Sequence, residues 1–108
     1  MGMDQTVTFP SGKVPPWPVV RDLLAQRGFA VQMRMINGEL ALPDEEPPET
    51  WRELRLGTSQ GMVTLRREQD QIVFVIWGTA DARLQQAWNA LASAFAEAGG
   101  GQILSPDS

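Results

Sequence analysis

The stretch Ile72–Trp77 (IVFVIW) is apolar at every position, and it decides how the rest of the chain has to be arranged. Successive side chains of a strand point to opposite faces of a sheet. One set is Ile72, Phe74 and Ile76, and the other is Val73, Val75 and Trp77. A strand that is apolar on both sides is typical of a sheet whose two faces are both covered.

The segments around this strand predict an antiparallel sheet. Alternating apolar and polar residues indicate further strands at Gln5–Phe9, Phe29–Met35, Leu40–Leu42, Trp51–Leu56 and Met62–Glu68, with a short edge strand at Gln102–Leu104. Asn37-Gly38 predicts a tight hairpin, because both residues tolerate positive φ. Strands joined by hairpins pair in antiparallel fashion, so the sheet as a whole is expected to be antiparallel.

Two further segments carry apolar residues at helical spacing. The first predicted helix is Pro18–Arg27, followed by Gly28 in a position that favours a left-handed helix end. The second has Thr79 as its expected N-cap, ends at Gly99–Gly101 and carries the apolar stripe Leu84, Trp88, Leu91, Phe95 and Ala98. The predicted fold is α+β in the order β-α-β-β-β-β-β-α, with about five to six strands and two helices packed on one face.

Length and composition bound the class of protein. The 108 residues predict a single α+β domain over 1–104 and a frayed C-terminal tail at 105–108. No apolar run is long enough to cross a bilayer, and the N-terminus has no signal-peptide core. Without cysteine there are no disulfides, which suits a reducing compartment, and the Arg-rich, Lys-poor usage suggests a bacterial genome. A bacterial cytoplasmic protein is therefore expected.

The residue inventory argues against catalysis. The chain has no His, Cys or Tyr, so it offers no imidazole for proton transfer and no Ser–His or Cys–His dyad. Gly57–Gly61 (GTSQG) matches the pattern of a hydrolase nucleophile elbow, but a predicted strand follows it, so a hairpin loop is expected. Asp44-Glu45-Glu46 lacks the spacing of a calcium loop. Neither a metal nor a cofactor is expected, and the protein is predicted not to be an enzyme.

The charge balance also limits the classes of partner that the chain is expected to bind. The net charge is −4, and an acidic chain repels nucleic acid, whose binding depends on phosphate neutralisation. A nucleic-acid partner is therefore not expected, and the lack of an apolar run long enough to cross a bilayer also argues against a membrane partner.

The second apolar set of the central stretch predicts a docking surface. Two helices can cover one face of the sheet, so Val73, Val75 and Trp77 are expected on the other, where exposure forgoes about 1.5–3 kcal/mol for each side chain. A protein partner is expected there, and a second copy is favoured because twofold dimers are the commonest assemblies. Alternatively, the tail and the acidic loop fold over this face, or long polar side chains flank the strand.

Three arginines are expected on the same face. Arg34, Arg55 and Arg66 alternate with the inward-facing residues of their strands, so together they could bind a small anion. The alternative is ordinary cross-strand pairing with Glu53 and Glu68.

These observations leave three functional hypotheses. The favoured one is a non-enzymatic protein-interaction or regulatory domain that self-associates through the helix-free sheet face. The second is a small-anion or metabolite-binding domain that uses the three arginines. The third is an acidic secretion-type chaperone, suggested by size, charge and amphipathic elements, although such chaperones usually begin with a helix.

Overall fold

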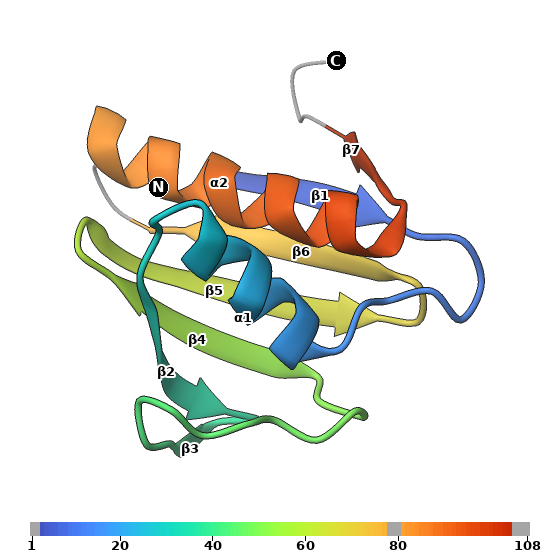
Figure 1. The fold of residues 1–108 in the computed structure, drawn as a ribbon, viewed down its shortest axis with the longest axis horizontal. Coiled ribbons are helices and arrows are strands. Elements are labelled where there is room, and N and C mark those ends of the chain that lie inside the picture. The colour runs from blue at the N-terminus through green and yellow to red at the C-terminus, as the bar shows by residue number, and fades with distance from the viewer. Residues whose placement is uncertain (1–2, 78–80, 105–108) are drawn as a thin grey trace.

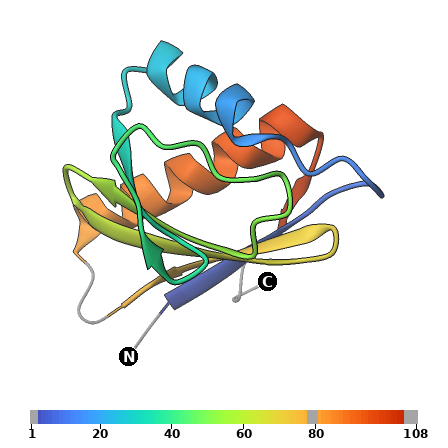
Figure 2. The same ribbon diagram turned by 90° about the horizontal axis from the view of Figure 1, so that it is seen from below.

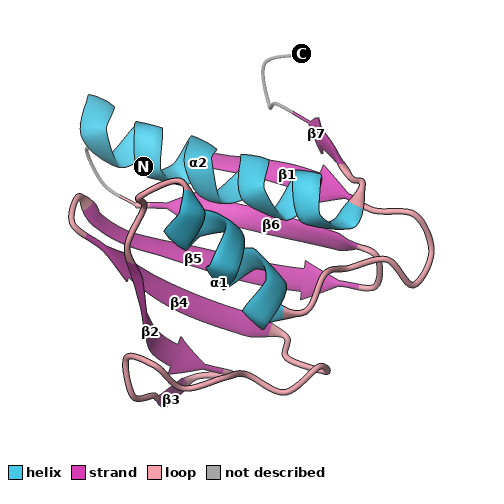
Figure 3. Ribbon diagram, in the orientation of Figure 1, coloured by secondary structure: helices cyan, strands magenta, loops and turns pink. Residues whose placement is uncertain are grey.

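The computed structural model describes residues 3–77 and 81–104, and over these ranges the chain forms seven strands and two helices. The elements follow the order β-α-β-β-β-β-β-α-β (Figure 1, Figure 3). The strands are β1 (Met3–Thr8), β2 (Val31–Ile36), β3 (Glu39–Leu40), β4 (Glu53–Thr58), β5 (Gly61–Glu68), β6 (Gln71–Ile76) and β7 (Gln102–Leu104). The helices are α1 (Trp17–Gln26) and α2 (Ala82–Gly99).

The seven strands form one antiparallel sheet in the spatial order β3-β2-β4-β5-β6-β1-β7. The apolar strand β6 pairs with β5 on one side and with β1 on the other. The connection through α1 carries the chain from β1 across the sheet to β2, and β4, β5 and β6 fill the space between them (Figure 1). The first and last strands of the sequence, β1 and β7, therefore lie side by side.

Both helices pack on the same face of the sheet, as Figure 2 shows. The strand residues buried beneath them include Val7, Leu54, Leu56, Val63, Leu65, Ile72, Phe74 and Ile76. Phe74 meets Phe95 of α2 edge to face, with the ring centroids 5.4 Å apart. The indole Nε1 of Trp88 donates a hydrogen bond to the Phe74 carbonyl oxygen at 2.7 Å. The set Ile72, Phe74 and Ile76 therefore faces the helices.

The predicted fold class is confirmed. The sheet has seven strands rather than about five or six because the short edge piece expected at Gln102–Leu104 joins it as β7, next to β1. The predicted loop at Gly57–Gly61 is a tighter hairpin than expected, since β4 runs to Thr58 and β5 begins at Gly61. The hydroxyl of Thr58 closes this turn by donating to the Gly61 carbonyl oxygen at 2.8 Å.

The ends of α2 are fixed by specific contacts. The expected N-cap Thr79 lies outside the described residues, as does the tail at 105–108. The described N-cap is Asp81, whose side chain accepts the Leu84 N–H at 2.9 Å. At the other end a Cβ on Gly101 would lie 2.6 Å from the Thr8 carbonyl oxygen, so the glycine run permits close packing as well as ending the helix.

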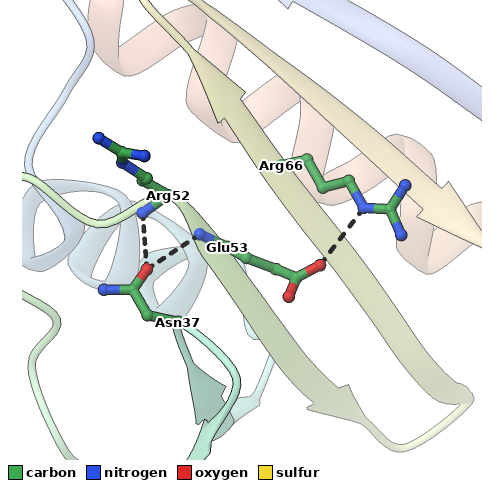
Figure 4. A network of polar contacts seen from close by, with 4 residues as sticks. All are labelled: Asn37, Arg52, Glu53 and Arg66. Carbon is green, nitrogen blue, oxygen red and sulfur yellow. Dashed lines mark hydrogen bonds and ion pairs between the residues drawn. The ribbon is translucent and has the colours of Figure 1, made fainter.

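Asn37 fixes the hairpin between β2 and β3 to the start of β4. Its φ is 51°, and its Oδ1 accepts the N–H groups of Arg52 at 2.8 Å and Glu53 at 3.2 Å (Figure 4). The Asn37 N–H also donates to the Glu53 carbonyl oxygen at 2.8 Å. These bonds set the position of Glu53, which in turn contacts Arg66.

We expect Asn37→Ala to lower the free energy of unfolding by about 1–3 kcal/mol, because it removes the acceptor for two N–H groups and strains a left-handed residue. Asn37→Asp is the matched control, since it keeps an acceptor oxygen and tolerates positive φ. Urea unfolding of both variants measures the effect. An Ala variant as stable as the parent chain would contradict this role of Asn37.

Candidate interaction face

The side of the sheet away from α1 and α2, called the helix-free face below, is defined by the strand register. Residues paired across neighbouring strands share a face, and the inward residues Leu65 and Phe74 are such a pair. The remaining alternate residues of the central strands therefore lie on the helix-free face. They include Asp4 and Thr6 on β1, Val73 and Val75 on β6, Met62, Thr64 and Arg66 on β5, and Glu53, Arg55 and Gly57 on β4.

The three apolar residues predicted for this face differ in how far the chain itself buries them. Val75 is only 6% exposed, and Val73 is half-buried. Trp77 follows β6 directly and is 56% exposed. The acidic loop at 43–50 does not cover this face, because it lies on the helix side, where Glu46 contacts Arg21 of α1 at 3.3 Å.

The side chain of Arg66 extends over part of this face. The guanidinium of Arg66 lies over the Trp77 ring, with Cζ 5.7 Å from the ring centroid. The Nε of Arg66 also donates to Glu53 Oε1 at 3.3 Å (Figure 4). Thr64, which lies beside Val75, is 2% exposed. Val75 and Thr64 in the middle of the face are thus buried, while Trp77 remains largely exposed to solvent.

Arg34 and Arg55 reach the same face by different routes. Arg55 pairs with Thr64 and follows the regular alternation of β4. Arg34 lies at a β-bulge, where the register with β4 shifts between Met33 and Met35. Its side chain runs over Gly57, so closely that a Cβ there would lie 2.8 Å from the Arg34 Nε. The bulge also brings Met35 to the helix-free face opposite Arg55, although alternation placed Met35 inward.

The three arginines therefore share one face, but they are partnered differently. Arg66 forms the predicted cross-strand ion pair with Glu53. Among the described residues, neither Arg34 nor Arg55 forms an ion pair, and the pairing expected with Glu68 is not formed. Four hollows on the described part of the chain are lined by other residues, so these arginines do not sit in any of them.

Sequence reasoning did not single out two other residues of this face. Met62 lies on the same alternate set of β5 as Arg66 and is 43% exposed. Asp4 pairs with Val75 on the opposite side of β6. The alternation of Met62, Thr64 and Arg66 was a usable signal for the first. Asp4 was missed because the expected strand began at Gln5.

A hollow of about 470 Å³ on the helix side lies between the proline-rich segment before α1 and the acidic loop. Trp17, Trp51 and Arg67 line it together with five prolines. The Arg67 guanidinium lies 4.9 Å from the Trp51 ring centroid and donates to the Glu49 carbonyl oxygen at 2.7 Å. Partial burial lowers the pKa of Arg67 below its ordinary value. These contacts tie the acidic loop to the sheet.

Other site chemistries find little support. Within the described ranges, no group of three acidic residues is placed to hold a metal ion, so Asp44-Glu45-Glu46 remains a loop. Neither helix in the described part of the chain is long and apolar enough to cross a membrane. No buried side-chain nitrogen or oxygen among these residues lacks a hydrogen-bond partner. The helix-free face is therefore the strongest candidate for function.

Comparison with protein-family models, with curated proteins and with solved structures found no match to this chain. No relative supplies a partner, a ligand or a set of site residues. The functional assignment accordingly depends on the geometry of the helix-free face and on the chemistry of its side chains.

Proposed function

We propose that this chain is a non-enzymatic protein-interaction domain that binds its partner through the helix-free face. The observation that carries the proposal is Trp77, which is 56% exposed and lies beneath the Arg66 guanidinium on the helix-free face. Met62 on the neighbouring strand is 43% exposed. Trp and Met are enriched where proteins meet, and exposed apolar patches often mark such contacts.

The surroundings of Trp77 fit contact with a protein better than contact with a small molecule. Val75 and Thr64, the neighbouring residues on this face, are buried, so the face has no deep hollow at this point. Arginine at its edges adds charge-assisted hydrogen bonds, and Arg is itself enriched at interfaces. The lack of His, Cys and Tyr is consistent with binding rather than catalysis. A cytoplasmic, bacterial setting remains part of this proposal.

A photo-reactive residue at Met62 should give a discrete covalent adduct in cells that express the chain natively, because a partner covers this face. The adduct should be lost when Trp77→Ser is added, since the anchor of the interface is then missing. The same probe at Ser93, on the exposed side of α2, is the matched control and should give no such adduct. Mass spectrometry of the adducts provides the measurement.

Two outcomes would contradict the proposal. The first is an adduct pattern that is the same from Met62 and from Ser93. The second is a Met62 adduct that persists unchanged in the Trp77→Ser variant while circular dichroism shows a folded chain.

The second candidate function is binding of a small anion by Arg34, Arg55 and Arg66. The observation that favours it is that Arg34 and Arg55 form no ion pair within the described part of the chain. Unpaired guanidinium groups on one face can bind sulfate or phosphate through bidentate hydrogen bonds.

Titration with sulfate, followed by calorimetry, should give saturable binding that Arg55→Ala weakens about tenfold, equal to the roughly 1.4 kcal/mol of one charge-assisted hydrogen bond. Arg83→Ala on α2 is the control and should bind sulfate like the parent chain. If the parent protein binds no sulfate, small-anion binding is ruled out as the second candidate function.

A further inference from the structure

The helix-free face carries opposite charges at the two ends of one row of side chains. Across the sheet, Asp4 pairs with Val75, Val75 with Thr64, and Thr64 with Arg55. The row therefore begins with a carboxylate on β1, crosses the sealed centre of the face and ends with a guanidinium on β4. Among the described residues, neither Asp4 nor Arg55 forms an ion pair.

We infer that the partner is a second copy of this chain, packed face to face about a twofold axis that runs parallel to the strands between β5 and β6. The inference rests on the proposed function and specifies its partner. Such an axis exchanges β5 with β6 and β4 with β1. It brings Asp4 of each copy over Arg55 of the other, so both ends of the row are neutralised.

The same axis pairs the exposed apolar side chains. The register of β5 with β6 sets Val75 beside Thr64, so the next outward positions along the strands are Trp77 and Met62. The axis therefore brings Trp77 of one copy against Met62 of the other. A sulfur–aromatic contact of this kind is favourable, and the symmetry forms it twice.

Other twofold axes along the strands do not bring these two charges together. An axis along β6 places Asp4 over Thr64, and an axis along β5 places Arg55 over Val75. An axis perpendicular to the strands that runs along this row sets Arg55 against Arg55 and Asp4 against Asp4. Among these axes, the charges therefore select the one between β5 and β6.

The dimensions of the domain allow this packing. Its two long axes are 35 and 34 Å, and the sheet extends across both of them in Figure 1, where the helix-free face is turned away from the viewer. A stable interface needs about 800 Å² from each partner, which is less than this footprint. Packed sheets lie about 10 Å apart, a gap that an extended Arg and a facing Asp can bridge together.

A reciprocal charge exchange tests the axis. Sedimentation equilibrium should show a dimer for the parent chain. Asp4→Arg alone and Arg55→Asp alone should each weaken dimerisation by about tenfold or more, because each sets like charges against one another at two symmetric positions. An equimolar mixture of the two variants should regain the parent affinity as a heterodimer, since both contacts then join opposite charges. Circular dichroism of each variant controls for folding.

Each outcome has one consequence. Recovery in the mixture supports the inferred axis. A parent dimer that neither variant weakens, or variants that do not recover on mixing, would overturn the axis. A parent chain that stays monomeric at millimolar concentration would overturn the second copy as partner. In all these negative cases the Met62 adduct, with its dependence on Trp77, still decides the proposed function separately.

Discussion

The structure depends on one constraint: strand β6 is apolar on both sides, and the helices of the described chain cover one of them. Ile72, Phe74 and Ile76 complete the core against α2, where Phe74 contacts both Phe95 and Trp88. The position of β6 between β5 and β1 follows, because an interior strand can have neighbours that shield each of its edges. The opposite set has no second layer of helices above it.

Side chains of the described residues cover only part of the second side of β6. Side chains replace the missing layer over Val75 and Thr64, where Arg66 reaches across to the Trp77 ring and is held by Glu53. Long arginine side chains can shield apolar surface while their charged ends stay in water. Trp77 lies at the edge of this cover, and Leu40 on β3 and Leu104 on β7 leave further apolar surface exposed on the same face. This exposed apolar surface is the feature of the fold that supports the proposed role in binding.

The sequence was sufficient for the fold class and for the faces of the central strands. Strict alternation in β5 and β6 assigned Arg66, Val73 and Trp77 to the helix-free face, and Asn37-Gly38 marked the hairpin at β2 and β3. Alternation predicted the wrong face for Met35, because a bulge adds a residue to β2. No local pattern in the sequence indicates this bulge.

The sequence also could not predict how far each side chain of the helix-free face is buried. Val75 and Trp77 belong to the same alternate set, yet 6% of one and 56% of the other is exposed. The difference depends on side-chain packing across neighbouring strands, which the alternation within one strand does not reveal. The acidic loop could equally have been expected over either face, and its place on the helix side is set by the contacts of Arg67 and Glu46.

Hydroxyl-radical footprinting of the four tryptophans shows whether the second side of β6 is open to solvent. In dilute solution, Trp77 should be oxidised much faster than Trp17, Trp51 and Trp88, whose exposed fractions are 5%, 2% and 6%. If Trp77 is instead as protected as the other three in the dilute monomer, its own chain already covers the second side of β6, and the account of an open face is wrong.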